Sequence, residues 1–271
     1  MDFRTVVDIP AAPFSIQPCE PLLFVGSCFA DNISVRFREE GFPVVVNPFG
    51  TMYNPASVLH TLERYEGDIP RIVFLTLGTN HVYRLKATGE IVDNCEKRPQ
   101  RLFQEEELTI DACADYLSQA VNVLLSRRPD VQVVLTVSPI RYRKYGYHES
   151  QLSKATLLLA VDKLVSLRSP FSTHLYYFPA YELVLDELRD YRFYAADMLH
   201  PSEQAVEYLW ERLTDHCFSA EAKAFLAEWR PLKQALAHRP FNPESAEYQA
   251  LMNKTMLKVA ELRKKYSTFA L

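Results

Sequence analysis

The sequence predicts an α/β protein with a five-stranded parallel sheet that is covered by helices on both faces. Short β-rich runs alternate with longer helical patterns, which is typical of this class. The predicted strands are nearly all apolar, as expected when both faces of a sheet are covered. The chain has 271 residues, 48% of them apolar, which is enough for a substantial core in one large domain or two small ones.

Five short apolar runs are the predicted strands: 22–26, 43–46, 71–78, 131–137 and 174–178. Parallel neighbours of this kind are joined by right-handed crossovers. The segment 81–94 interrupts the rhythm, because its residues alternate around Thr88 and Gly89. It therefore predicts a hairpin inserted after the third strand.

Helices are predicted between and after these strands, at 29–40, 56–65, 109–127 and 151–168. Thr109 and Asp111 give the third of them a cap and an acidic first turn. From about residue 203 the pattern is helical to the end, with a break at 239–245 that contains Pro240 and Pro243. We therefore predict an α/β domain over residues 1–217 and a helical C-terminal extension over 218–271, packed on the same domain.

The charge and the cysteines exclude several classes of protein. Thirty basic and 34 acidic residues give a net charge of −4 without blocks of like charge, which argues against nucleic acid or anionic membranes as partners. The first twenty residues lack a signal-peptide pattern, and no run approaches 18 apolar residues. The five cysteines are scattered and form no Cys-x-x-Cys pair. We expect a cytoplasmic protein with free thiols and neither metal nor cofactor.

Gly26, Ser27 and Cys28 follow the first predicted strand and begin a helix. Glycine permits a tight turn, and the start of a helix offers free backbone N–H groups that can stabilise an oxyanion. The turn thus can present a nucleophile. In the alternative interpretation, Ser27 is only a helix cap and Cys28 a small core residue.

Polar residues follow other predicted strands as well. Asp197 and His200 precede Pro201 after the last strand, where a carboxylate can orient an imidazole as in a catalytic triad. Gly78 and Asn80 follow the third strand, and Gly50 follows the second. These three are candidate oxyanion donors or ordinary turn residues. All would lie at the edge of the sheet where open α/β folds bind ligands.

Three arginines are candidates for binding an anionic substrate. Arg189 and Arg192 stand shortly before Asp197, and Arg141 follows the fourth strand. The alternatives are internal ion pairs for the first two and a solvated loop for the third.

The motifs together resemble the GSCFA family, which is named after a motif that stands here as Gly26-Ser27-Cys28-Phe29-Ala30. Other stretches resemble it in the same order: "NPFGTMYNP", "LGT", "NCEKRP", "TVSPIR", "LSKA", "YFPAYE" and "DELRDYRFYAADMLHPS". The resemblance covers roughly residues 20–215 and leaves out the last 55 or so. This family is similar to the SGNH, or GDSL-like, hydrolases, so the resemblance implies a three-layer α/β/α fold with a five-stranded parallel sheet.

The resemblance also implies roles for particular residues. Asp197 and His200 match the Asp-x-x-His of the SGNH hydrolases, Gly78 and Asn80 match their Gly-x-Asn, and Gly50 is the candidate for the remaining glycine. Their Gly-Asp-Ser corresponds without a gap to Gly26-Ser27-Cys28, which puts Cys28 at the nucleophile. A shift of one residue would select Ser27.

We favour Cys28 on the gapless correspondence. A thiol is partly ionised near neutral pH whereas a serine hydroxyl needs a base, but a mostly ionised Cys28 would still need His200 as its partner. Three functional hypotheses remain open. The protein is a hydrolase or acyltransferase for a small-molecule or glycan ester or thioester, a non-catalytic ligand-binding or regulatory protein on the same scaffold, or a redox sensor through Cys28. The two tail helices are candidates for a homodimer contact or for a lid over the site.

Overall fold

The central sheet has the predicted five strands. The computed structural model describes residues 4–93, 95, 98–166 and 169–270. The strands are β1 (Leu22–Gly26), β2 (Val44–Val46), β3 (Ile72–Leu77), β7 (Gln132–Val137) and β8 (Leu175–Tyr177). All neighbours pair in parallel, in the order β2-β1-β3-β7-β8. This order is that of a doubly wound sheet, so the predicted fold class is confirmed.

The predicted helices are present with small differences at their ends. They are α1 (Cys28–Glu39), α2 (Pro55–Arg64), α3 (Ile110–Arg127), α4 (Tyr147–Val165) and α6 (Glu203–Cys217). Thr109 caps α3 as predicted, since its side chain accepts a hydrogen bond from the Ala112 N–H. Residues 167 and 168, the predicted end of the fourth helix, lie outside the described residues.

The remaining elements near the site are short. Helix α5 (Ala180–Glu182) continues into a π-helical segment, η3 (Leu183–Leu188). Three 3-10 turns are η1 (Gln100–Leu102), η2 (Arg143–Tyr145) and η4 (Tyr191–Phe193). Their short length explains why helical periodicity does not reveal them.

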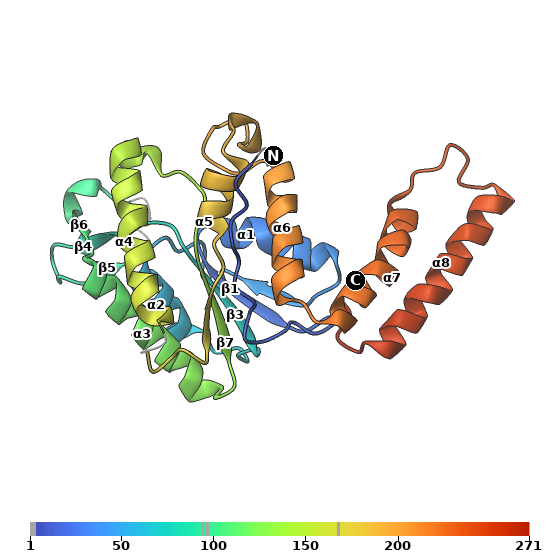
Figure 1. Cartoon of the computed structure of the whole chain (residues 1–271), viewed down its shortest axis with the longest axis horizontal. Coiled ribbons are helices and arrows are strands. Elements are labelled where there is room, and N and C mark those ends of the chain that lie inside the picture. The colour runs from blue at the N-terminus through green and yellow to red at the C-terminus, as the bar shows by residue number, and fades with distance from the viewer. Residues whose placement is uncertain (1–3, 94, 96–97, 167–168, 271) are drawn as a thin grey trace.

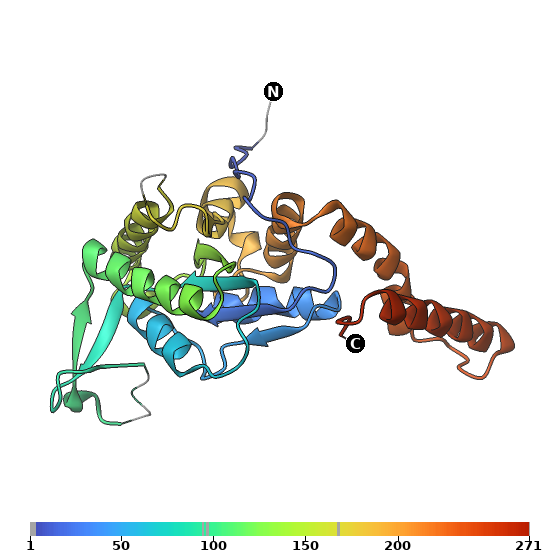
Figure 2. The same cartoon turned by 90° about the horizontal axis from the view of Figure 1, so that it is seen from below.

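Alternate residues of β1 point to opposite layers of the molecule. Leu22 and Phe24 pack in one apolar cluster with α1 and α6, whereas Leu23 and Val25 pack in another with α2, α3 and α4. Figures 1 and 2 show these helices on the two sides of the sheet. The molecule therefore has three layers, and the strands are apolar because both faces are covered.

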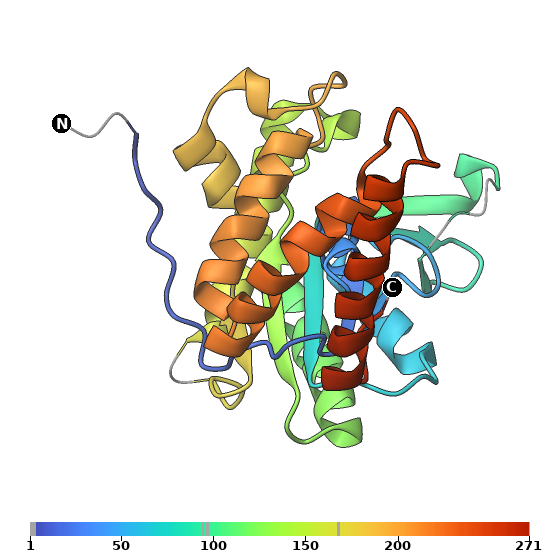
Figure 3. The ribbon, with the colours of Figure 1, turned by 90° about the vertical axis from the view of Figure 1, so that its right-hand side faces the viewer.

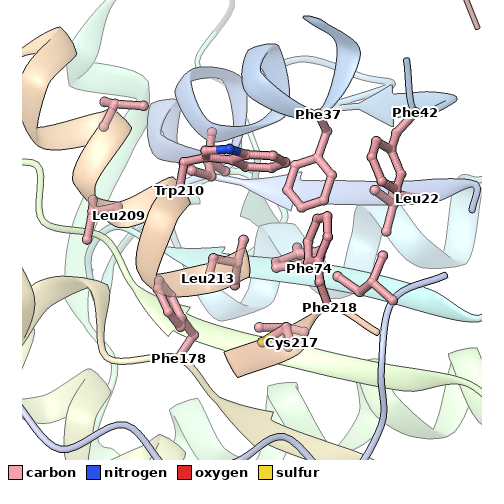
Figure 4. Packing of buried hydrophobic residues seen from close by; sticks show 14 of the residues in the cluster. Leu22, Phe37, Phe42, Phe74, Phe178, Leu209, Trp210, Leu213, Cys217 and Phe218 are labelled. Atoms are coloured by element: carbon pink, nitrogen blue, oxygen red, sulfur yellow. The ribbon is translucent and has the colours of Figure 1, made fainter. Parts of the chain in front are cut away.

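An aromatic cluster holds α1 and α6 on the sheet (Figure 4). The Phe37 ring of α1 lies edge-on to Trp210 of α6, with 4.8 Å between the ring centroids. The same ring lies 5.7 Å from Phe74 of β3 and 5.8 Å from Phe218. Because these rings are buried and interlocked, they fix the position of α1 and thus of its N-terminus.

The predicted insertion after β3 is a small antiparallel sheet. It consists of β4 (His81–Leu85), β5 (Ile91–Val92) and β6 (Phe103–Glu107), in the order β5-β4-β6. The hairpin of β4 and β5 confirms the prediction for the described part of 81–94, and residue 94 lies outside it. Strand β6 was not predicted, because its sequence FQEEE is mostly charged and only Phe103 is buried.

Two tail helices, α7 (Ala220–Ala237) and α8 (Ala246–Lys265), stand beside the α/β layers (Figures 1 and 3). The break predicted at 239–245 is confirmed, and Ser245 caps α8. The tail contacts the end of α1: Trp229 donates to the Glu39 carbonyl at 3.2 Å, and Phe269 packs closely on Gly41. The domain boundary between residues 217 and 218 stays a prediction.

No helix in the described part of the chain combines the length and the apolar character needed to cross a membrane.

Gly26 provides a test of the turn that leads from β1 into α1. Its φ is +141°, and a Cβ at this position would lie 2.1 Å from the Thr76 carbonyl oxygen. We expect Gly26→Ala to lower the free energy of unfolding by about 3 kcal/mol or more, because strain and overlap combine. Gly50→Ala is the matched control: its φ is +92°, but the added Cβ would meet no atom within 4 Å.

The control variant should lose only about 1 kcal/mol, the cost of the backbone conformation. Chemical denaturation of both variants measures the difference. Equal losses would show that the contact with Thr76 is not restrictive.

Candidate active site

Ser27 is the N-cap of α1 and is buried, with 2% of its surface exposed. Its Oγ accepts a hydrogen bond from the Phe29 N–H at 3.3 Å and lies 3.1 Å from Oγ1 of Thr76. Its own N–H donates to the Thr76 carbonyl at 2.9 Å. The hydroxyl is thus engaged inside the protein, in the capping arrangement that the alternative interpretation of the motif describes.

Cys28 is the first residue of α1 and is partly exposed. Its Sγ lies 3.5 Å from the Tyr53 hydroxyl. Its N–H is in the first turn of the helix, where backbone donors have no intrahelical acceptor. Cys28 is therefore the more accessible of the two candidate nucleophiles.

The cavity at Cys28 is small. It has a volume of about 20 Å³ and is lined by Ser27, Cys28, Tyr53, Gly78, Ser138, Ile140 and Tyr142. This is room for one water molecule and not for an acyl group. Burial raises the pKa of the Tyr53 hydroxyl, and the hydrogen bond with Cys28 raises it further, so this group remains a neutral donor near pH 7.

The loop after β2 is tied to this turn by side chains. Asn47 accepts from the Gly26 N–H at 2.9 Å and donates to Oδ2 of Asp31 at 3.0 Å. Thr51 donates to the same carboxylate oxygen at 3.3 Å. Because the loop carries Tyr53 two residues further on, this network holds the tyrosine over the start of α1.

Asp197 and His200 form a hydrogen-bonded pair, as predicted from their spacing. His200 Nδ1 lies 2.5 Å from Asp197 Oδ2, and Oδ1 of Asp197 accepts from the Leu199 and His200 N–H groups. These bonds, those from the two backbone groups first, lower the pKa of Asp197. An ionised carboxylate can only accept, so the proton lies on Nδ1 and leaves Nε2 free to act as a base.

His200 lies in a groove of about 480 Å³ between α1 and α6, beside Asn32, Val35 and Arg36. Asn32 is four residues after Cys28 and so lies on the same side of α1, one turn further along. Among the described residues, His200 forms no hydrogen bond with Ser27 or Cys28. The His-Asp pair therefore lies beside α1, the helix that begins at Cys28, but does not form a triad with Cys28.

The three predicted oxyanion donors have acceptors within the protein. The N–H of Gly50 donates to the Asn47 carbonyl, and that of Gly78 donates to the Tyr53 carbonyl, both at 2.8 Å. The Asn80 amide donates to the Leu108 carbonyl at 2.8 Å and is buried. Only Gly78 lines the cavity at Cys28, and none of the three aims a free donor into it in this structure.

The arginines separate into two groups. Arg141 and Arg189 line one cavity of about 320 Å³, which reaches Ile140 near Cys28. Arg192 lies outside it and stacks on the Phe193 ring at 4.8 Å. Arg141 also supports the histidine loop, since its guanidinium donates to the Met198 carbonyl and its N–H donates to that of Leu199.

Two residues near the site were missed in the sequence. Tyr53 lies in "NPFGTMYNP" and Lys154 in "LSKA", so each belonged to a family-like motif without receiving a role. Lys154 is only 2% exposed, and its Nζ donates to the Gly78 carbonyl at 2.6 Å. Burial lowers the pKa of this amine to about 7. The spacing of Lys154 is the signal that could have found it, because it stands three and seven residues before Leu157 and Val161, on the face of α4 that is buried.

The fold and the site together define an α/β protein whose polar groups gather at the carboxyl edge of a doubly wound sheet. The chain belongs to the GSCFA family: the GSCFA family model matches residues 21–71 and 67–213. The model of the GSCFA domain protein, C-terminal domain, matches residues 229–271. The resemblance is confirmed over its predicted extent of roughly residues 20–215, and the tail matches a separate C-terminal model. Among curated proteins, no relative of this sequence is found.

Several solved structures are similar to this chain. A member of the lipolytic protein G-D-S-L family from Veillonella parvula has 10% identity and a TM-score of 0.46, over 72% of this chain and 96% of that one. A carbohydrate esterase family 3 protein from Talaromyces cellulolyticus has 10% identity and a TM-score of 0.40, over 72% and 95%. A variant of an acetyl-xylooligosaccharide esterase from Geobacillus stearmophilus has 13% identity and a TM-score of 0.44, over 75% and 96%.

The buried amine of Lys154 makes stability depend on pH. Its pKa is about 7 in the folded protein against an ordinary value of 10.5, so protonation opposes folding. This cost is complete below pH 7 and disappears as the pH rises toward 10.5. We therefore compare the free energy of unfolding of the wild type with that of Lys154→Met. The wild-type value minus the variant value should increase by about 1.4 kcal/mol per pH unit between pH 7.5 and 9.5. Urea titrations at several pH values measure it, and a constant difference would contradict the assignment.

Proposed function

We propose that the protein is a hydrolase or acyltransferase that acts on an ester or thioester through Cys28, His200 and Asp197. The observation that carries the proposal is the hydrogen-bonded His-Asp pair beside α1, the helix that begins with the partly exposed Cys28. Nucleophilic catalysis requires a base that is oriented by a carboxylate and can reach a thiol, and here the oriented base lies beside the helix that the thiol begins.

In the first step, His200 Nε2 removes the proton from Cys28 Sγ. The thiolate forms a bond to the acyl carbon, and the carbonyl electron pair moves to oxygen. Collapse of this intermediate breaks the bond to the leaving alcohol or thiol, which takes the proton from His200. Water or a second alcohol then attacks the acyl-enzyme with His200 again as base, which releases the product and restores the thiol.

The oxyanion is assigned to the Cys28 N–H and the Tyr53 hydroxyl. The first belongs to the first turn of α1, where backbone N–H groups have no intrahelical acceptor, and the second already lies 3.5 Å from Sγ. Gly50, Gly78 and Asn80 would need to release their present acceptors before they could contribute. His200 would also need to come within hydrogen-bond reach of Sγ, and catalytic hydrogen bonds are often long or poorly aligned before substrate binds.

A second candidate function is that of a non-catalytic ligand-binding protein on the same scaffold. It is favoured by the volume of about 20 Å³ at Cys28 and by Tyr53 and Tyr142, which line that space. A protein that only binds a ligand would have no need to open the small space at Cys28 for an acyl group. Turnover separates the two candidates.

The proposed reaction is tested with short p-nitrophenyl esters and acyl thioesters. Cys28→Ala and His200→Ala should each lower kcat/KM by about 10²-fold or more, because nucleophile or base is lost. Cys95→Ala removes another partly exposed thiol and is the matched control, with unchanged turnover expected. No turnover by the wild-type protein on a broad acyl panel would favour the binding function.

Ser27→Ala tests the choice of nucleophile. Because Ser27 is a buried cap, the variant should lose about 1 to 2 kcal/mol of stability and keep most of its turnover at a temperature where it is folded. Thermal unfolding and ester hydrolysis are measured on the same sample. Abolished turnover in folded Ser27→Ala, with activity retained in Cys28→Ala, would assign the reaction to the serine.

A further inference from the structure

The cavity that contains Arg141, Lys154 and Arg189 is larger and more cationic than the space at Cys28. Its volume is about 320 Å³, at the lower end for small-molecule sites. Three cationic side chains line it against one carboxylate, that of Asp190. This carboxylate accepts a hydrogen bond from the Arg192 N–H at 2.9 Å and keeps its charge, so the lining has three cationic groups against one anionic group.

Lys154 is the unusual member of this lining. Its side chain comes from α4, is almost completely buried, and has the Gly78 carbonyl as its acceptor. An ammonium group has three donors, so two remain without an acceptor among the described residues. Among the described residues no ion pair involves Lys154, whereas Arg189 lies 4.0 Å from the exposed carboxylate of Asp186. Burying such a cation is costly unless an anion joins it.

The other walls suit a flat or ring-shaped group. The Arg141 guanidinium lies 4.2 Å from the centre of the Tyr147 ring and 5.4 Å from that of Tyr194. Tyr181 and Tyr191 add further aromatic surface. Part of the Arg141 donor edge is used by the Met198 carbonyl, so Arg141 serves mainly as a wall of the cavity, and Lys154 and Arg189 are the other cationic side chains of the lining.

We propose that this cavity binds the oxyanion of a small ligand of about monosaccharide size, a carboxylate or a phosphate, with Lys154 and Arg189 as its charged partners. The cavity reaches Ile140, which also lines the space at Cys28. The bound group is therefore the anionic part of the acyl substrate. Only this last assignment rests on the proposed function, because binding of the anion does not require catalysis.

The test is calorimetric titration of the full chain with glucuronate, glucose 6-phosphate and glucose. At least one anionic sugar should bind tenfold or more tightly than glucose, and the better of the two identifies carboxylate or phosphate as the group recognised. Lys154→Met and Arg189→Gln should each weaken that binding by tenfold or more. If Lys154→Met does not fold, Arg189→Gln still decides.

Two neighbouring residues give matched controls. Lys163→Met removes an exposed lysine from the same helix, and Arg192→Gln removes an arginine just outside the cavity. Neither should change the affinity. Equal binding of glucose and the anions, no binding of any sugar, or anion binding unaffected by Arg189→Gln would overturn the inference. None of those results would change the outcome of the test with neutral p-nitrophenyl esters. The anion site and the proposed reaction can therefore be rejected independently of one another.

Discussion

The turn from β1 into α1 lies directly against β3, and the placement of both candidate nucleophiles depends on this contact. Gly26 comes so close to the Thr76 carbonyl that a side chain would not fit, and the next N–H donates to the same oxygen. Ser27 is thereby turned inward, where its hydroxyl meets Thr76 and caps the helix. Since consecutive residues entering a helix point about 100° apart, Cys28 is directed elsewhere, toward Tyr53.

Most of the fold could be predicted from the sequence because its signals are local. Strands such as Ile72–Leu77 are apolar throughout since both faces are covered, and helices such as α3 carry their own cap at Thr109. Strand β6 shows the limit of this reasoning. Its residues are charged because one edge of a small exposed sheet tolerates them, and its pairing with β4 is decided by contacts distant in sequence.

The site was predicted less completely, for reasons that lie in side-chain direction. The spacing of Asp197 and His200 was sufficient to predict their pairing. The two residues are three apart in a short turn before Pro201, which brings the carboxylate and the imidazole together. Asn80 ends the correct strand, yet its amide is used to hold Leu108 at the base of the inserted sheet. The Gly-x-Asn motif places Asn80 at the end of β3. The hydrogen-bond acceptor of its amide is Leu108, which follows the inserted sheet, and the motif contains no information about that insertion.

The Gly78 carbonyl connects the two spaces at the edge of the sheet. Gly78 lines the small space at Cys28, and its carbonyl accepts from Lys154, which lines the larger cavity. One donor of the Lys154 ammonium is used by this carbonyl, and two are left for an anion in the larger cavity. The peptide group between Gly78 and Thr79 therefore joins the two spaces, because its carbonyl accepts from Lys154 and its N–H donates to the carbonyl of Tyr53, the residue whose side chain lies beside the thiol.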